Sequence, residues 1–392
     1  MKSITTLVKA LVVFCFLLLP ANNAFSAGDE FPFGLLLVGP ANDHGWSQAH
    51  FEAGQAMEKV FPGAKMLYID KVNPADRAGI TIPMLVDDLV SKGAKLIIAN
   101  SDDMKDGVRE AAVMHPDIKF IHVSGDDVIT GKADANLSNL MGRMYYGKMM
   151  AGFAAAMTSK TGKIAYLGPL INAETRRLSA AAYLGAHYAW TKVLKKSAAD
   201  LHFKVSWIGF WFNIPGVTSD PTLVANSFFD SGYDVVLSGI DTTEALVVAG
   251  QKRKNGKDVY AIPYDFQGAC ASAPEACLGV PYFNWVPGYT KMIGQAIKGN
   301  WQQEFLWLGP DWKNINSVKT SSVSFEAGSV LGDTQKKALA AFTKELAGGL
   351  NLFTGPLNFQ DGSPFLAAGA TATDDQMWNL PQLLKGMEGA SK

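Results

Sequence analysis

The stretch GLLLVGPANDHGWSQ, residues 34–48, places a short apolar run directly before a polar turn that contains a tryptophan. Gly34–Val38 predicts a buried β-strand, and Ser47 is expected to cap the helix that follows. Turns normally hold small polar residues, so Trp46 requires an explanation. Three explanations are open at this point: a core residue, a reactive elbow beside Ser47, or a flat wall for a ligand.

Short apolar runs alternate with longer amphipathic segments along most of the chain, as in a parallel sheet covered by helices. Two such series occur, one before about Leu140 and one after about Lys160, with no Ser/Gly-rich linker between them. The sequence therefore predicts an α/β protein with two similar lobes joined by several crossings. The expected strands are Gly34–Val38, Lys65–Ile69, Lys95–Ala99, Lys119–Val123, Lys163–Leu167, Lys204–Trp211, Asp234–Ser238 and Val259–Tyr264.

Aromatic and acidic residues gather after these strands, where parallel sheets bind their ligands. The acids alone could be helix caps, which suits Asp102 and Asp241, but capping does not explain the tryptophans. We therefore expect a ligand site in the cleft between the lobes. Its candidate residues at the strand ends and in the aromatic segments are Asp43, Trp46, Ser101, Asp102, Trp211, Phe212, Asp241, Asp265 and Trp285.

The chemistry of these residues suits a neutral, planar ligand that carries hydroxyl or amino groups. Carboxylates accept hydrogen bonds from such groups, and indole or phenyl faces stack on flat rings. A phosphorylated ligand would require a glycine-rich cradle or clustered basic residues, and the sequence contains no P-loop or G-x-G-x-x-G motif. A nucleoside or nucleobase fits this site, whereas a nucleotide does not.

The N-terminal segment predicts export from the cytoplasm. Lys2 and Lys9 flank a short polar start, Ala10–Leu19 is an apolar run, and Ala24–Ser26 offers a cleavage site, so residues 1–26 are expected to form a cleaved signal peptide. The net charge is −1 for the full chain, which argues against nucleic acid or an anionic membrane as a partner. Cys270 and Cys277 remain after cleavage, and this spacing in an oxidising compartment predicts a disulfide.

Six stretches resemble the basic membrane protein family of ABC-transporter substrate-binding proteins, which includes bacterial purine nucleoside receptors. The resemblance covers nearly all of the mature chain. The stretches are GPANDHGWSQAHFEAG (39–54), YYGKMMAGFAAAMTSKTGKIAYLG (145–168), FWFNIPG (210–216), YAIPYDFQ (260–267), NWVPGYTKMIGQAIKGNW (284–301) and FTGPLNFQDG (353–362).

The resemblance implies specific roles for several residues. Asp43 and Trp46 match the family's opening acid and aromatic residue, and Asp265 matches its ribose-binding acid. Trp211 or Phe212 falls where the second stacking ring is expected. Lys291 aligns with a lysine that reaches the ligand, although Asn284 and Trp285 could displace it. This tryptophan-rich version leaves a nucleoside, a free base and a flavin open as ligands, and the family's lipoprotein cysteine is missing.

The fold implied by the resemblance is the type I periplasmic-binding-protein architecture, two Rossmann-like lobes with parallel sheets joined by a three-crossing hinge. The first lobe is expected at 27–140 plus about 266–312, and the second at 141–265 plus about 313–392. The implied function is that of a monomeric periplasmic receptor that passes a purine nucleoside or nucleobase to an ABC permease. The lobes are expected to bend at crossings near Leu140, Phe266 and Lys313.

Other functions have weaker support in these residues. A hydrolase would need a G-x-S-x-G elbow, and Gly45–Ala49 differs from it by one residue, but no histidine or acid is placed to complete a triad. A metal site or cofactor is not expected, because the six histidines form no compact ligand set. A periplasmic sensor for a receptor kinase would use the same closing cleft and stays an alternative to transport.

Overall fold

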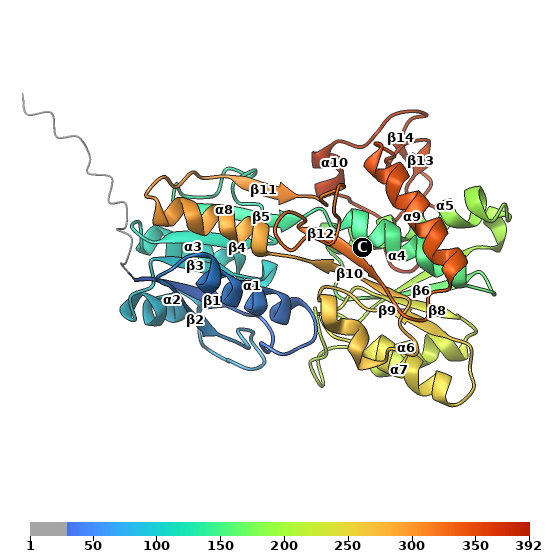
Figure 1. Ribbon diagram of the computed structural model, residues 1–392, viewed down its shortest axis with the longest axis horizontal. Helices are drawn as coiled ribbons and strands as arrows, with labels where there is room; N and C mark the ends of the chain where they lie inside the picture. The colour runs from blue at the N-terminus through green and yellow to red at the C-terminus, as the bar shows by residue number, and fades with distance from the viewer. Residues whose placement is uncertain (1–29) are drawn as a thin grey trace, which may run out of the picture.

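The structure is a computed structural model that describes residues 30–392. The predicted signal peptide, residues 1–26, lies outside the described residues. Two α/β lobes, each built on its own parallel sheet, lie side by side along the long axis of the molecule (Figure 1). Within residues 30–392, no helix has both the length and the apolar character needed to cross a bilayer.

The first lobe is built on six parallel strands in the order β11-β5-β4-β3-β1-β2. All four residues of the central β3 are buried, as expected for a strand covered on both faces. The strands are β1 (Phe31–Leu36), β2 (Ala64–Ile69), β3 (Leu96–Ala99), β4 (Lys119–Val123), β5 (Leu137–Gly142) and β11 (Phe305–Leu308), and the helices are α1 (Trp46–Val60), α2 (Ile82–Ser91), α3 (Lys105–Met114) and α8 (Val286–Ile297).

The second lobe is built on five parallel strands in the order β15-β7-β6-β8-β9. Its strands are β6 (Lys163–Gly168), β7 (His202–Trp207), β8 (Val235–Ser238), β9 (Tyr260–Ile262) and β15 (Met387–Glu388). The helices that follow or cover them are α4 (Tyr145–Thr158), α5 (Ala173–Tyr188), α6 (Pro221–Asp230), α7 (Glu244–Lys254), α9 (Asp333–Ala347) and α10 (Asp374–Trp378).

Helices α4 and α5 pack closely because glycine lies at both points of contact. A Cβ atom on Gly152 of α4 would overlap the carbonyl group of Ala182, and one on Gly185 of α5 would overlap that of Met149. Any larger residue at either position would push the helices apart. This pair therefore forms a tightly packed support beside the second sheet.

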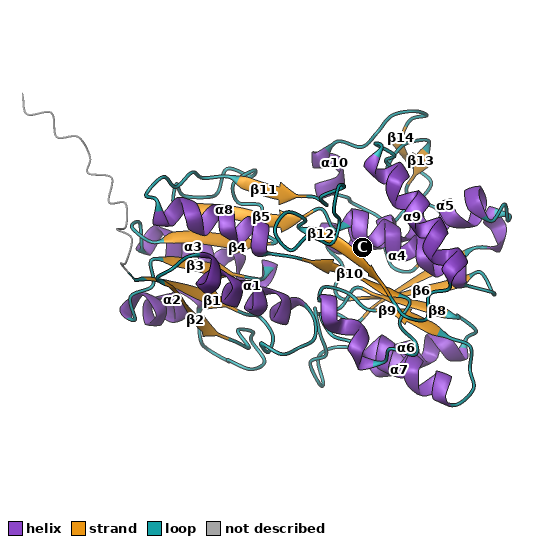
Figure 2. Cartoon of the chain, viewed as in Figure 1, coloured by secondary structure: helices purple, strands orange, loops and turns teal. Residues whose placement is uncertain are grey.

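The chain passes between the lobes three times: from β5 to α4, from β9 to β10 and from β11 to β12. Strands β10 (Gly279–Phe283) and β12 (Val323–Ala327) pair antiparallel and form a ribbon in the middle of the molecule (Figure 2). Asp265 lies at the base of this ribbon, where its main chain pairs with Pro281 and Phe283. The ribbon thus connects the lobes beside the strand ends that face each other.

Several shorter elements complete the fold. Cys270 and Cys277 are joined by a disulfide with their Cα atoms 5.5 Å apart, and both pack against the core of the second lobe. The remaining elements are the 3₁₀ helices η1 (Asp102–Met104), η3 (Ala198–Asp200) and η4 (Gln267–Ser272), the π-helical turn η2 (Ala189–Val193), and the paired strands β13 (Leu357–Asn358) and β14 (Pro364–Leu366).

Candidate functional site

A cavity lies between the two lobes. The residues around it follow the carboxyl ends of strands in both sheets, which is where open parallel sheets bind ligands. Its walls combine aromatic rings with carboxyl, amide and hydroxyl groups. The lining residues are Val38, Trp46, Asn100, Ser101, Asp102 and Ser124 from the first lobe, and Glu174, Trp211, Asp241 and Tyr264 from the second.

Trp46 forms a rigid wall of this cavity. It is only 7% exposed, and its Nε1 donates a hydrogen bond to the main-chain oxygen of Asn100 at 2.5 Å. Its ring packs edge-on against Phe283 and Trp285, each with a centroid distance of 5.3 Å, and against His50 at 4.8 Å. The indole therefore faces the cavity on one side and an aromatic cluster on the other.

Asp43 holds the turn that positions Trp46, and it is not among the residues that line the cavity. One carboxylate oxygen accepts hydrogen bonds from the main-chain N–H groups of Gly45 and Gln48, and the other accepts from that of Ser47. The prediction that Ser47 caps this helix is wrong. Ser47 lies inside α1, and its buried hydroxyl accepts a hydrogen bond from the N–H of Gly39 instead.

Trp211 lines the cavity from the second lobe and sits on a loop between β7 and α6. It is partly exposed, and its main-chain oxygen accepts a hydrogen bond from the N–H of Asp241 at 2.9 Å. This bond ties the loop to the segment after β8. The neighbouring Phe212 packs edge-on against Phe210 and does not line the cavity.

Acidic groups are concentrated on the second-lobe side. Burial raises the pKa of Asp241 well above its usual range, and the nearby carboxyls of Asp265 and Asp43 raise it further. Burial also raises the pKa of Glu174, while Arg177 and the hydroxyl of Ser124 oppose that shift. Ligand N–H or O–H groups that bind these carboxyls would relieve the cost of burying them.

One lysine is buried close to this acidic group. Lys148 of α4 is 1% exposed, and its ammonium donates to the main-chain oxygen of Ser238 at 2.7 Å and lies 3.2 Å from the ring centre of Tyr264. Burial lowers the pKa of Lys148 to about 7, although the charge of Asp265 favours its protonated form. Asp265 is fully buried, and neither of its carboxylate oxygens has a hydrogen-bonding partner.

Five of the ten residues predicted from the sequence line the cavity, namely Trp46, Ser101, Asp102, Trp211 and Asp241, and five do not, namely Asp43, Phe212, Asp265, Trp285 and Lys291. Trp285 is buried between His50 and Phe283, with ring centroids 4.3 and 4.6 Å away. Lys291 lies on the surface of α8 and pairs with Glu304 at 2.5 Å.

The sequence-based prediction missed five lining residues, Val38, Asn100, Ser124, Glu174 and Tyr264. Four of them follow the end of a strand by one or two residues, whereas Glu174 is the second residue of α5. They were missed because a single residue of these types after a strand carries no distinctive chemistry.

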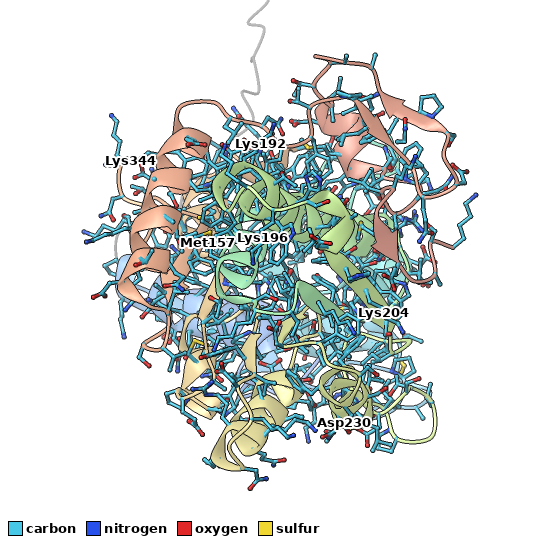
Figure 3. The ribbon with its side chains drawn as sticks, turned by 90° about the vertical axis from the view of Figure 1, so that its right-hand side faces the viewer. Met157, Lys192, Lys196, Lys204, Asp230 and Lys344 are labelled. Carbon is cyan, nitrogen blue, oxygen red and sulfur yellow. A yellow bond between two sulfur atoms is a disulfide. The ribbon has the colours of Figure 1, made fainter. Side chains whose placement is uncertain are left out.

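The lining of the cavity contains neither lysine nor arginine. Lys192, Lys196 and Lys344 lie on the outer surface at the far end of the second lobe (Figure 3), while Lys148 and Arg177 are buried. Among residues 30–392, no cluster of histidine, cysteine and acidic side chains could hold a metal ion. The cavity is therefore suited to a ligand that donates hydrogen bonds and carries no phosphate.

The lobes touch on two sides of the cavity. On one side, the hydroxyl of Ser124 donates a hydrogen bond to Glu174 at 2.5 Å, from the first lobe to the second. On the other, the main chain of Gly45 lies so close to Asp241 that a Cβ atom on Gly45 would overlap the Asp241 carbonyl oxygen. The structure thus shows the two lobes closed around the cavity.

Comparison with known proteins identifies the family. The sequence profile of the Bmp family, described as PnrA-like ABC transporter substrate-binding proteins, matches residues 32–344. The chain belongs to this family. The resemblance found in the sequence is thereby confirmed. The family implies a small-molecule ligand, an ABC transporter as partner, and a location of the binding protein outside the cytoplasm.

Individual relatives agree with this assignment. A purine-binding protein of Brucella abortus is 27% identical over 94% of this chain and 95% of its own length. A putative ABC transporter glucose-binding protein of Haloferax volcanii is 24% identical over 72% of this chain and 66% of its own length. The crystal structure of an ABC transporter solute-binding protein from Aeropyrum pernix covers 91% of this chain and all of that one, at 11% identity and a TM-score of 0.63, which confirms the predicted type I fold.

Proposed function

We propose that this protein captures a purine base or purine nucleoside in the interlobe cavity and delivers it to an ABC permease. The protein acts in the periplasm as a monomer, after removal of residues 1–26, and it changes no covalent bond of its ligand. The lobes open and close by bending at the three crossings, and closure traps the ligand.

The composition of the cavity wall carries this proposal. Trp46 and Trp211 provide aromatic surface from opposite lobes, and Asp102, Glu174 and Asp241 provide acceptors for N–H and O–H groups. A flat, nitrogen-rich ring matches both features, because it stacks on indole and donates to carboxyls.

The relatives support the same ligand class without deciding it. The purine-binding relative matches nearly the whole of this chain, whereas the putative glucose-binding relative matches a smaller part of both chains. A sugar would also use the carboxyls and can pack its C–H faces against indole, so the order of the two ligand classes rests on the more complete match to the purine-binding relative. We therefore place purines first and include a sugar in the test.

Isothermal titration calorimetry tests the proposal directly. The purified chain is titrated with adenine, guanine, their nucleosides, a purine nucleotide, glucose and riboflavin. At least one base or nucleoside is expected to bind with a Kd below about 10 μM, and the nucleotide, glucose and riboflavin are not. Tight binding of glucose or riboflavin, with no purine bound, would overturn the proposal.

Two acidic residues provide matched variants for the same titration. Asp241→Asn is expected to weaken purine binding by about 1.5 to 3 kcal/mol, the range for hydrogen bonds to charged groups. Asp265→Ala, which the resemblance to nucleoside receptors also points to, is expected to have a smaller effect because Asp265 does not line the cavity. Glu110→Gln on the exposed face of α3 serves as the control.

A further inference from the structure

Arg177 of α5 carries a buried charge without a direct ionic partner. Its side chain is 2% exposed, and within residues 30–392 its guanidinium forms no ion pair with a carboxylate. Burying a charge is costly unless other groups replace the water that it loses. The groups that do so here belong to the C-terminal part of the chain.

The end of helix α10 holds the guanidinium of Arg177. Nη1 donates hydrogen bonds to the main-chain oxygens of Trp378 at 2.9 Å and Met377 at 3.3 Å. The guanidinium carbon lies 4.7 Å from the centre of the Trp378 ring, close enough for a cation–π contact. These residues lie beyond 32–344, the part of the chain that matches the family profile.

Helix α10 is itself fixed to the other lobe. Asp374 forms an ion pair with Arg143, which lies in the crossing from β5 to α4. Trp378 packs edge-on against Phe305 and Trp307 of β11, with centroid distances of 4.8 and 5.1 Å. Arg177 is thus held by a segment that contacts both lobes.

Glu174 lies one helical turn before Arg177, on the same face of α5. Both residues border a pocket outside the cavity, and Glu174 also lines the cavity itself. The hydroxyl of Ser124 donates to Oε2 of Glu174, whereas no donor within residues 30–392 bonds Oε1. Burial raises the pKa of Glu174 and the charge of Asp102 raises it further, while Arg177 and the Ser124 hydroxyl lower it.

We propose, on the basis of the function proposed above, that Arg177 is a positioning residue of the ligand site, which keeps the Glu174 carboxyl charged so that its Oε1 accepts a hydrogen bond from the ligand. A charged carboxylate only accepts hydrogen bonds, and it binds N–H and O–H donors more strongly than a neutral carboxyl does. The C-terminal segment thereby contributes to binding although Met377 and Trp378 do not line the cavity.

Other titratable and charged groups face Glu174 and Arg177 from the surrounding elements. Some of them titrate themselves, so only a comparison of proteins with and without Glu174 isolates its contribution. They are Asp102 of η1, Lys105 of α3, Asp126 after β4, Tyr145 of α4, Tyr166 of β6, Asp241 after β8, and Tyr264 and Asp265 after β9.

The experiment measures affinity by calorimetry from pH 5 to pH 8, with whichever of adenine, guanine, adenosine and guanosine binds the wild type most tightly. In Arg177→Met, the pH below which affinity falls is expected to rise by about one unit, because loss of a nearby positive charge favours the protonated carboxyl. Affinity at the acidic end should then be about 10-fold below that of the wild type. In a Glu174→Gln background, adding Arg177→Met should leave the pH profile unchanged.

Two further variants separate the charge of Arg177 from its packing. Arg177→Lys keeps a positive charge but loses the planar guanidinium, so its profile should stay closer to the wild type than to Arg177→Met. Arg176→Met is the matched control, because Nε of Arg176 also donates to the C-terminal segment, at Leu380, but the residue borders neither the cavity nor the outer pocket. It should lower stability and keep the wild-type pH profile.

Nuclear magnetic resonance of protein with ¹³C-labelled glutamate carboxyls gives the same information without a ligand. The signal that disappears in Glu174→Gln belongs to Glu174, and its pKa should rise in Arg177→Met. An unchanged pKa with an unchanged binding profile would overturn the role of Arg177. A profile shift that persists in the Glu174→Gln background would overturn it as well, since the charge would then act on another group.

The two measurements also distinguish this role from the function on which it rests. If none of the four purines binds, the proposed function fails, and the role of Glu174 as an acceptor for a purine fails with it. A Glu174 pKa that still rises in Arg177→Met would then place the error in the choice of ligand and not in the action of Arg177 on Glu174.

Discussion

Trp46 and Trp211 line the same cavity from opposite lobes, but the molecule supports them in different ways. Trp46 begins a helix, packs against three aromatic rings and donates a buried hydrogen bond to Asn100. Trp211 lies on a loop, is partly exposed and is anchored through its main chain to Asp241. One wall is fixed by the core of its lobe, whereas the other depends on a loop.

The surroundings of the two walls differ in the same way. An aromatic cluster of His50, Phe283 and Trp285 supports the first-lobe wall. Buried charged groups, Lys148 and Asp265, lie on the second-lobe side. The comparison indicates that the first lobe provides a preformed surface for the ligand, while the second lobe contributes polar groups whose environment changes as the lobes close.

The largest effect is expected for Trp46→Ala. Removing an indole that is 7% exposed should lower the free energy of unfolding by about 3 to 5 kcal/mol, because it leaves a cavity in the aromatic cluster. Trp46→Phe keeps a ring but loses the hydrogen bond to Asn100, so a smaller loss is expected. Chemical denaturation measures both values. A Trp46→Ala variant as stable as the wild type would remove the distinction between the two walls.

Gly45→Ala should act on closure, with little effect on folding. The added methyl group would overlap the Asp241 carbonyl oxygen only when the lobes are closed, so binding should weaken by about 3 kcal/mol or more. Small-angle scattering should show compaction when ligand is added to the wild type and none for this variant. Gly309→Ala, where the added atom meets only Arg143 at 3.6 Å, is the control. Normal binding by Gly45→Ala would show that closure does not require this contact.

Trp211→Ala should weaken binding without destabilising the fold. Stacking of a base on an aromatic ring contributes about 1 to 3 kcal/mol, and the loss of binding should fall in that range. The free energy of unfolding should change by less than about 0.5 kcal/mol, since the ring is partly exposed on a loop. Calorimetry and denaturation on the same sample measure both. A loss of stability comparable to that of Trp46→Ala would contradict the comparison.

Lys148→Met should change how stability depends on pH. Burial lowers the pKa of Lys148 from 10.5 to about 7, so between these values the unfolded chain binds more protons and stability rises with pH. The wild type should therefore gain stability relative to Lys148→Met above pH 7, by at most about 1.4 kcal/mol per pH unit. Without the lysine the pKa of Asp265 rises further, and this also makes the wild type gain stability relative to Lys148→Met as the pH increases. Thermal melts from pH 6 to pH 9 measure this dependence. A melting temperature that changes with pH by the same amount in both proteins would contradict the prediction.

The smallest effect is expected for Lys291→Met. Its side chain is 45% exposed and pairs with Glu304, so stability should change by no more than about 0.5 kcal/mol. Ligand affinity should stay the same, because Lys291 does not line the cavity. A clear loss of affinity, measured by calorimetry, would show that α8 contributes to the site as the resemblance to nucleoside receptors implies.

The sequence predicted the architecture well because the strand cores are short apolar runs. Lys119–Val123 matches β4 at both ends, and the other seven expected strands each overlap an observed one. β5 and the strands from β10 onward were missed; in β5, Ser138 and Asn139 interrupt the apolar pattern, although both are buried. Polar residues that hydrogen-bond inside a sheet do not follow the alternation on which such predictions depend.

The site was harder to predict because its residues come from both lobes. Trp46 could be found as an aromatic residue in a turn, and Asp241 as an acid after a strand. The role of Asp43 in holding the turn depends on three hydrogen bonds to nearby N–H groups, which a pattern of residue types does not specify. The hydrogen bond from Ser124 to Glu174 joins residues fifty positions apart, so no local motif indicates it.

Native mass spectrometry of the protein purified from its own cell envelope tests the central claim most directly, since a closed cavity retains its ligand during purification. The account predicts a single bound molecule with the mass of a purine, which is released on unfolding and replaced when a different purine is added in excess. A bound sugar or flavin that added purines do not displace would contradict it.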